Sequence, residues 1–424
     1  MKCAIIADDN TGATDAAGML TEKGVRTCLI IDSRKMEPSS LKKYDAVVAG
    51  TQARSTSPKT AYTRTREAIK DLSTLKPKTI QIKYCSTFDS TPKGNIGQAL
   101  DAAIDETGVK QIIVCPALPV NGRVTALGHL FVNGELLSDS PLKNHPLNPM
   151  TDSNLVRWLS YQTKAEVGLA NIQEIQKGAP SLKRYLTGLK KKKITYVVAD
   201  ALTQSDIGIL MESLKNEKVI SGGSGISAEM ARVLFPGKKP LDFTKRINNL
   251  RPGTAAVSGS MSPATAAQNK HALKNGFTGL MLDPIKLLKG NFNRKAILKK
   301  ASDAIAAGAK ILFYSSSVPS QKVKQTAEKL GLSDAKAGLK IGAELASLAS
   351  HLLKNKLIGR LIVSGGETSG TVCSKLGFNV FEVGLPVDPG VPYIFPESDS
   401  ECILVLKSGN FGSEDLYIKV DKLK

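Results

Sequence analysis

Short, continuous apolar runs alternate with amphipathic segments along most of the chain, which is the pattern of an α/β fold. The first run, residues 3–7, ends at Asp8-Asp9, and residues 13–20 then follow a helical pattern that stops at Gly24. Further buried strands are expected at 27–31, 46–49, 79–83, 111–115 and 195–199, with helices near 59–72, 96–104, 152–161 and 205–214. Apolar runs of this kind are typical of a parallel sheet that is covered on both faces.

The pattern breaks at residues 235–253, where prolines, glycines and mixed charges replace the alternation. Such composition marks linkers between domains. Beyond it, strands are expected at 254–257, 310–314, 361–363 and 403–406, and helices from 263 and at 294–307, 321–330 and 339–353. We therefore expect two α/β domains, residues 1–240 and 252–424, each with a mainly parallel sheet flanked by helices.

Two adjacent carboxylates, Asp8 and Asp9, stand at the carboxyl end of the first strand. Open α/β sheets bind their ligands at this edge. An acid pair there can take a proton from a hydroxyl or hold Mg²⁺, although one aspartate can also cap the following helix. Because a cap needs only one of them, a functional role is favoured for the pair.

A dense polar loop follows the strand at residues 79–83. Residues 84–95 bring hydroxyls, an acid, a base and an amide together just before the next helix. Loops of this composition, positioned by a strand, are typical of sites for polar ligands. A thirteen-residue hairpin is expected at 125–137, with Asn133-Gly134 as its turn. The Gly-Gly-Ser-Gly run at 222–225 fits an anion site and a helix entry turn equally well.

Three turns rich in glycine or serine follow strands in the second half, at residues 258–260, 364–366 and 407–412. Adjacent glycines let a phosphate approach the backbone, and a helix start offers it unpaired N–H groups. A single turn of this kind is more often a simple tight turn. Three turns at strand ends can converge on one polyphosphate, although neither GxxxxGK[ST] nor GxGxxG is present.

The composition is basic, with a formal net charge of +20. A solvated basic surface, including Lys190–Lys193, is the simpler interpretation, and attraction of anions is the sharper one. An aromatic content of 5% and the lack of a nucleic-acid motif disfavour nucleic acid. No apolar run approaches the roughly 18 residues of a membrane span, and the absence of a basic-then-apolar N-terminal signal favours the cytoplasm. The cysteines and histidines show no spacing for a zinc site.

Several of these segments resemble the four-carbon acid sugar kinase family, whose members phosphorylate tetronic acids with ATP. The similar segments, in the family's order over nearly the whole chain, are residues 7–13, 257–260, 364–370, 389–392 and 406–412. Asn10 departs from the bulky apolar residue expected at its position. The loop 83–97, together with 116–123 and Lys143-Asn144-His145-Pro146, is similar to the 3-oxo-tetronate 4-kinase branch of the family.

The resemblance implies an N-terminal acid-sugar domain, a C-terminal nucleotide domain and an active site in the cleft between the domains. It implies phosphoryl transfer from ATP, with Mg²⁺, to the C4 hydroxyl of 3-oxo-tetronate, and Asp8 or Asp9 as the group that accepts the proton. The candidate substrate ligands are Arg54, Lys83, Asp89, Ser90, Lys93, Gly94 and Asn95. The candidate ATP ligands are Ser258, Ser260, Gly365, Gly366, Glu367, Thr368, Gly409 and Gly412. Protein ligands of the metal are not predicted.

Other interpretations stay open on the sequence. The same chemistry can act on D-threonate, L-threonate or D-erythronate, which a kinetic comparison of these acids decides. A non-catalytic nucleotide or acid sensor and a basic nucleic-acid binder are alternatives from other classes. The expected partners are an acid sugar and ATP, without nucleic acid or membrane, and the oligomeric state is left open.

Overall fold

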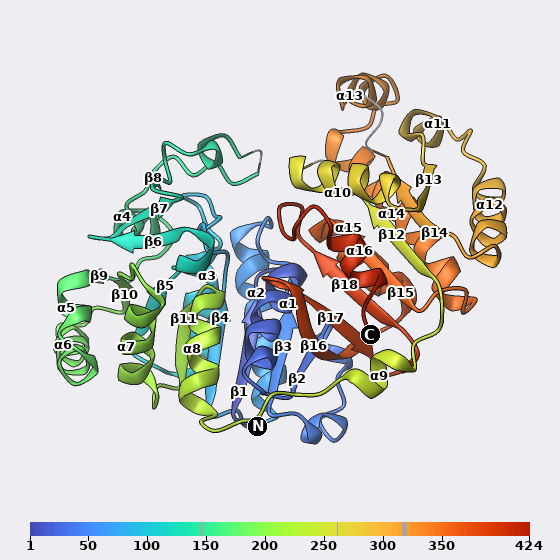
Figure 1. The fold of residues 1–424 in the computed structure, drawn as a ribbon. Helices are drawn as coiled ribbons and strands as arrows, with labels where there is room; N and C mark the ends of the chain where they lie inside the picture. Colours follow the sequence, from blue (N-terminus) through green and yellow to red (C-terminus); the bar gives the residue numbers. More distant parts are fainter. Residues whose placement is uncertain (146, 261, 316–319) are drawn as a thin grey trace. The chain divides into compact units, whose positions relative to one another are not determined.

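The computed structural model describes residues 1–145, 147–260, 262–315 and 320–424, except for the side chains of Ser320, Ala335 and Glu367. Pro146, which belongs to one of the similar segments, therefore lies outside the described residues. The chain divides into two compact units, Met1–Leu241 and Asp242–Lys424, coloured blue to green and yellow to red in Figure 1. Each unit is an α/β layer structure, which confirms the predicted fold class.

A parallel sheet forms the middle layer of the first unit. Its strands are β1 (Cys3–Ala7), β2 (Thr27–Ile30), β3 (Ala46–Gly50), β4 (Thr79–Lys83), β5 (Ile112–Cys115), β9 (Val167–Ala170), β10 (Tyr196–Ala199) and β11 (Val219–Gly222). They lie in the order β2-β3-β1-β4-β11-β5-β10-β9, and every neighbouring pair is parallel. Every residue of β1, β3 and β4 is buried, as expected for apolar strands covered on both faces.

Helices connect and cover these strands. They are α1 (Asn10–Glu22), α2 (Pro58–Ser73), α3 (Ile96–Thr107), α4 (Leu155–Ser160), α5 (Ile172–Gln176), α6 (Ala179–Lys191), α7 (Gln204–Leu214) and α8 (Ser224–Leu234), with 3₁₀ turns at Ser33–Lys35, Ser40–Lys43, Pro119–Asn121 and Pro141–Asn144. Helix α2 packs beside α3, and α1 packs beside α8. The glycine run at 222–225 leads directly into α8, with Gly223 and Gly225 close to the carbonyls of Pro116 and Ala117. It is therefore a helix entry turn.

A small antiparallel sheet also belongs to the first unit and consists of β6 (Arg123–Ala126), β7 (His129–Val132) and β8 (Glu135–Leu136). Asn133 and Gly134 join β7 to β8 with φ angles of 52° and 89°. Two positive φ angles in a two-residue loop define the hairpin turn for which Asn-Gly is favoured. The predicted hairpin is therefore confirmed, and the sheet adds one more strand to it.

The second unit contains a sheet that is parallel on one side. Its strands are β12 (Thr254–Ser258), β13 (Phe277–Met281), β14 (Lys310–Tyr314), β15 (Arg360–Ser364), β16 (Val380–Asp388), β17 (Val391–Pro396) and β18 (Ile403–Lys407). Within this unit they lie in the order β13-β14-β12-β15-β18-β17-β16. The pairs from β13 to β18 are parallel, and β17 pairs antiparallel with both β18 and β16.

The helices of the second unit are α9 (Thr244–Asn248), α10 (Pro263–Lys274), α11 (Pro284–Leu288), α12 (Arg294–Ala306), α13 (Ser320–Lys329), α14 (Asp334–Lys354), α15 (Gly366–Leu376) and α16 (Leu416–Asp421). Helix α9 lies inside the segment expected to be a linker. Phe243, just before α9, stacks on Phe395 of β17 with ring centroids 5.7 Å apart. The end of the predicted linker therefore packs as part of the second unit.

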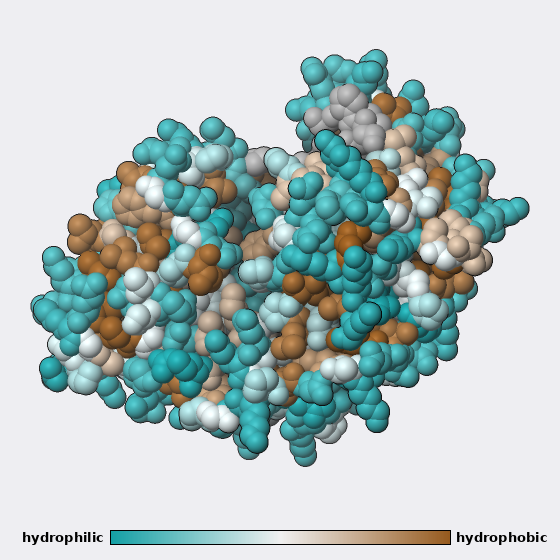
Figure 2. Space-filling view, in the orientation of Figure 1, coloured by the Kyte–Doolittle hydropathy of each residue, from teal (hydrophilic) through white to brown (hydrophobic). Residues whose placement is uncertain are grey.

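Basic residues are spread over the surface. Lys190–Lys193, at the end of α6, and the Lys299–Lys300 pair in α12 are exposed. Figure 2 shows hydrophilic residues covering much of the visible face. This arrangement agrees with the simpler interpretation of the positive charge. Among the described helices, none combines the length and apolar character that a membrane span requires.

Candidate active site

The acid pair lies at the carboxyl end of β1, where α1 begins. Asp9 caps α1, because its Oδ1 accepts a hydrogen bond of 2.7 Å from the Gly12 N–H and its Oδ2 accepts one of 2.9 Å from the Thr11 hydroxyl. Asp8 takes no part in the cap. The two neighbouring carboxylates therefore have different surroundings, and the helix cap explains only one of them.

Arg54 joins the two carboxylates. It follows β3, whose last residue, Gly50, lies in register with Ala7 of β1, so the loop after β3 reaches the acid pair. Its Nε and Nη2 donate to Asp8 over 2.7 and 2.8 Å, and its Nη1 lies 2.9 Å from Asp9 Oδ2. Arg54, predicted as a substrate ligand, is thus paired with both aspartates in the structure.

Lys83 enters the same cluster from β4. It is in register with Ala7, and its buried Nζ lies 3.8 Å from Asp15 Oδ2 on α1. Gly12 makes this approach possible, since a Cβ at its position would lie 2.5 Å from Lys83 Nζ and 2.5 Å from Asp9 Oδ1. Asp15 was not predicted from the sequence, where its only mark is an acid inside an apolar, small-residue helix.

The surroundings shift the pKa values of the neighbouring Asp8 and Asp9 in opposite directions. Burial raises the pKa of Asp8, and Arg54 only partly offsets it. Burial also acts on Asp9, but Arg54, Lys83 and the bonds from Gly12 and Thr11 outweigh it and hold its pKa below the ordinary value. Burial raises the pKa of Asp15 against the attraction of Lys83. Of the pair, Asp8 is therefore the better proton acceptor.

The polar loop after β4 contributes one carboxylate to the same region. Asp89 lines a small cavity of about 20 Å³ together with Asp8, Arg54 and Lys83, which is room for about one water molecule. Its Oδ1 accepts a hydrogen bond of 2.6 Å from the Thr87 hydroxyl. Four of the predicted substrate ligands, Arg54, Lys83, Asp89 and Asn95, thus line this cavity with Asp8.

Two of the predicted substrate ligands, Ser90 and Asn95, also hold the loop in place. The buried Ser90 hydroxyl donates to Phe88 O and accepts from Trp158 Nε1 and Gln162 Nε2. The Asn95 amide donates to the backbone carbonyls of Ala53 and Arg54. Asn95 therefore ties this loop to the loop that carries Arg54, and Ser90 fixes it to the core.

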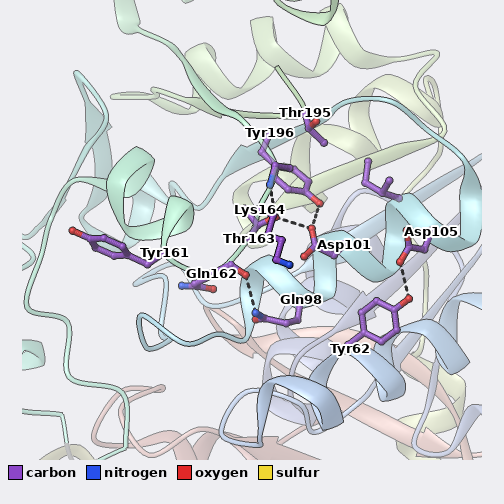
Figure 3. A pocket seen from close by; sticks show the side chains of 12 residues that line it. Tyr62, Gln98, Asp101, Asp105, Tyr161, Gln162, Thr163, Lys164, Thr195 and Tyr196 are labelled. Carbon is purple, nitrogen blue, oxygen red and sulfur yellow. Dashed lines mark hydrogen bonds between the residues drawn. The ribbon is translucent and has the colours of Figure 1, made fainter. Parts of the chain in front are cut away.

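Gln162 and Gln98 secure the start of α3. Gln162 Oε1 accepts from the Gly97 N–H over 3.0 Å. Gln98 donates to Gln162 O over 2.7 Å, as Figure 3 shows beside a surface cavity lined by α3 and residues 161–165. Lys93 is exposed, and Gly94, with φ of 147°, exchanges two backbone hydrogen bonds with Thr91. Lys93 is therefore exposed to solvent on a turn whose backbone is held by hydrogen bonds.

In the second unit, a row of polar residues closes the carboxyl ends of three adjacent parallel strands. Ser258 of β12, Ser364 of β15 and Lys407 of β18 are in register with one another. The buried Ser258 hydroxyl accepts from Asn269 of α10, and Ser364 pairs with the Tyr417 hydroxyl of α16. Ser258, predicted to touch ATP, therefore lies beneath the turn and supports it.

The three predicted turns meet above this row. A Cβ at Gly259 would lie 2.2 Å from the Thr368 hydroxyl, and one at Gly409 would lie 2.5 Å from Ser260 Oγ. Gly365 has φ of 124°, and its Cβ position is 3.4 Å from the Ser260 nitrogen. The close approaches require glycine at these positions and bring the turns together, as the hypothesis of one polyphosphate site expects.

The remaining predicted ATP ligands lie around the place where the three turns meet. Gly366 is exposed at the start of α15, which follows β15 directly, and the Glu367 side chain is outside the described residues. Gly412, with φ of 84°, packs against Leu416, while Gln268 holds the carbonyls of Phe411, Gly412 and Ser413. The helix start and the loops together offer backbone N–H groups, which is how proteins cradle phosphates.

Comparison with known families defines the class of protein. Residues 3–230 match a family described as a sugar-binding N-terminal domain. Residues 255–417 match a family described as a nucleotide-binding C-terminal domain. The chain is therefore a two-part protein of the class that combines these two domains.

Relatives identify the family. A 3-oxo-tetronate kinase of Pseudomonas savastanoi pv. phaseolicola is 36% identical, with 98% of this chain and 96% of the relative covered. Another from Pectobacterium atrosepticum is 35% identical, with 100% and 99% covered. The chain belongs to the four-carbon acid sugar kinase family, in its 3-oxo-tetronate kinase branch, and membership makes it an ATP-dependent kinase.

Solved structures agree with this assignment. A protein of Salmonella typhimurium LT2 superposes with a TM-score of 0.85 at 32% identity, and 99% of each chain is covered. A Haemophilus influenzae protein gives 0.79 at 33% identity, again with 99% of each chain covered. The fold described above is therefore shared over the full length of these relatives.

Proposed function

We propose that this kinase transfers the γ-phosphoryl group of ATP to the C4 hydroxyl of 3-oxo-tetronate. The observation that carries the proposal is the cluster at the carboxyl edge of the first sheet, where Arg54 bridges Asp8 and Asp9 with Lys83 beside them. Such a cluster suits a hydroxyl that must be oriented and deprotonated. The relatives named as 3-oxo-tetronate kinases supply the substrate.

In the proposed step, the C4 oxygen attacks the γ-phosphorus, the bond to the β,γ-bridging oxygen breaks, and ADP leaves. Asp8 receives the hydroxyl proton, because burial raises its pKa. Asp9 has three hydrogen-bonded or ionic partners already, so it positions the cluster. Kinases depend on such positioning and charge stabilisation more than on covalent chemistry.

The rest of the acid sugar binds along the loop after β4. Asp89 faces the cavity that Asp8 lines, and it accepts a hydrogen bond from a substrate hydroxyl. Lys93 is exposed and has no acidic partner among the described residues, so its charge is available for the substrate carboxylate. Gly94, Asn95 and Ser90 act by holding this loop in place.

ATP binds in this proposal to residues 252–424, and the acid sugar binds to residues 1–240. Backbone N–H groups around Ser260, Gly365, Gly366, Thr368 and Gly409 receive its phosphates. Among the described side chains, no group of three or more His, Cys, Asp or Glu is placed to hold a metal. This fits Mg²⁺, which binds phosphate oxygens and water rather than a protein cage and neutralises charge there.

The experiment compares acids and variants in one assay. The purified chain is incubated with ATP, Mg²⁺ and, separately, 3-oxo-tetronate, D-threonate, L-threonate or D-erythronate, and ADP release gives kcat/KM for each. We expect the highest value with 3-oxo-tetronate. A higher value with another acid would reassign the substrate, and no ADP release with any of them would contradict kinase activity.

Two aspartate variants then separate the roles in the pair. Asp8→Asn should lower kcat by about 10²–10⁴-fold, the usual contribution of a general base. Asp9→Asn should lose less activity and keep its helix, because asparagine caps as well as aspartate. Asp105→Asn, on the exposed end of α3, is the control and should retain wild-type turnover. Near-normal turnover in both pair variants would contradict the proposed mechanism.

A further inference from the structure

One carbonyl in the nucleotide unit accepts three hydrogen bonds. Gly409 O, in the loop after β18, accepts from Ser262 Oγ at 2.5 Å, Thr265 Oγ1 at 2.9 Å and Lys407 Nζ at 3.1 Å. The C=O and N–H of a trans peptide point in opposite directions. Fixing this carbonyl toward α10 therefore turns the Asn410 N–H away from it, and Asn410 N makes no hydrogen bond within the described residues.

Lys407 supplies the charged member of these three donors. It is 1% exposed, and its Nζ has two neutral partners, Gly409 O and the Thr265 hydroxyl, the latter at 2.9 Å. Buried lysines are normally paired with a carboxylate. Within the described side chains, no acid pairs with Lys407, so its buried amino group lies under the loop without an acidic partner.

The other groups around Lys407 do not supply a negative charge. Ser364, its register partner on β15, is neutral and bonded to Tyr417 of α16. Burial raises the pKa of Tyr417 to about 12, which keeps the phenol protonated. On α10, Thr265 is neutral and His271 instead lies 3.8 Å from Glu414. The Glu367 side chain of α15 is outside the described residues.

We propose that Lys407 is a positioning residue of the nucleotide site: it orients the Gly409 peptide and takes up a proton when the anionic phosphates of a nucleotide bind above it. The proposal rests on the proposed nucleotide site and adds to it a residue and a linked proton. Lys407 itself is too buried to reach the phosphates, so it acts through the loop and through its charge.

The direction of the linkage follows from burial. Desolvation lowers the pKa of Lys407 to about 7, so at pH 8 most molecules without nucleotide hold a neutral amine. A bound polyphosphate favours the charged form and raises this pKa again. Binding at pH 8 should therefore take up between about 0.5 and 1 proton, and affinity should fall roughly 10- to 50-fold from pH 7 to pH 9.

The test is calorimetric titration of the full chain with ADP at pH 8. At this pH the nucleotide's own phosphates are already deprotonated, since their last pKa is near 6. Titrations in two buffers of different ionisation enthalpy give the number of protons taken up. We expect a value between about 0.5 and 1. If ADP binds without proton uptake, the proposed role of Lys407 is refuted but the proposed nucleotide site is not. If ADP does not bind, both are refuted.

Variants assign the proton. Lys407→Met should bind ADP more weakly at pH 7, with uptake abolished and affinity nearly independent of pH between 7 and 9. Lys375→Met removes an exposed lysine of α15, and His271→Gln removes the nearby histidine, and both should keep the uptake. Loss of uptake in His271→Gln, or its persistence in a folded Lys407→Met, would overturn the proposal. The wild-type measurement decides the outcome even where a variant fails to fold.

Discussion

Replacing Gly12 with alanine is the sharpest test of the acid–base cluster, because local propensity and the structure predict opposite results. Gly12 lies in the first turn of α1, where alanine is normally favoured over glycine by about 0.5–1 kcal/mol. The added Cβ would lie 2.5 Å from both Asp9 Oδ1 and Lys83 Nζ, and 3.5 Å from Arg54 Nη2. A gain in helix stability is thus opposed by a clash in the site.

The size of the effect follows from these distances. Ordinary contact begins at 3.4 Å, so Asp9 and Lys83 must each move away from the Cβ by roughly 0.9 Å. A displacement of about 1 Å near the reacting groups can lower the rate about 10²-fold. Overpacking costs about 1–3 kcal/mol, which exceeds the gain in helix propensity. We expect a loss of up to about 2 kcal/mol in stability and a fall of about 100-fold in kcat/KM.

The assay measures kcat/KM with ATP and 3-oxo-tetronate alongside the free energy of unfolding in urea. Gly188→Ala in α6 is the matched control, since its added Cβ meets nothing within 4 Å. That variant should be stabilised by about 0.5–1 kcal/mol and keep full activity. A Gly12→Ala enzyme within threefold of the wild-type kcat/KM would refute the reasoning, because the cluster would then tolerate the displacement.

Two further predictions concern buried polar groups. Asn10 is buried against Gly50, and neither its Oδ1 nor its Nδ2 has a hydrogen-bond partner among the described residues. Asn10→Leu should therefore raise the free energy of unfolding by about 1–2 kcal/mol. Asn95→Leu, which removes hydrogen bonds to two carbonyls, should lower the free energy of unfolding. Loss of stability in Asn10→Leu would show that its amide is satisfied. For Lys407, the folded pKa of about 7 lies below its ordinary value of 10.5, so the unfolded chain binds more protons between these pH values and wild-type stability rises with pH through this group. The stability of Lys407→Met relative to wild type should fall from pH 7 to pH 9 in urea unfolding, and a constant difference would contradict the lowered pKa.

The sequence was sufficient to predict the fold class and the edge of the parallel sheet at which the candidate catalytic residues lie. Apolar runs such as residues 3–7 and 79–83 become fully buried strands, and the residues that end them, Asp8-Asp9 and Lys83, meet because parallel strands end at one edge. The three glycine turns converge for the same reason. These features follow from local pattern and sheet geometry.

Strands without that pattern could not be predicted. In β13 only Phe277 is buried, so no apolar run marks it. The antiparallel β16 and β17 contain Pro386, Pro392 and Pro396, and proline normally argues against a strand because it cannot donate to the ladder. These elements depend on tertiary pairing, which a single sequence does not display.

The ion-pair partners of charged residues also could not be predicted from the sequence. Arg54 was expected to hold a substrate, and the structure pairs it with Asp8 and Asp9, because the register of β1 and β3 brings them together. Asp15 was not singled out from the sequence, and Lys407 was expected only as the first residue of the turn 407–412, without a role of its own. Their importance comes from burial and from what lies beside them, which depends on residues far away in the chain.

Charge balance supports the proposal that each unit binds one of the two substrates. In the first unit, the carboxyl groups of Asp8, Asp9 and Asp15 lie beside Arg54 and Lys83, so both cations of the cluster already have acidic partners. A balanced cluster has little net attraction for an anion, so we infer that it receives the neutral hydroxyl end of the tetronate, while the carboxylate binds near Lys93. In the second unit, Lys407 has no described acidic partner, and an incoming polyphosphate supplies the missing negative charge.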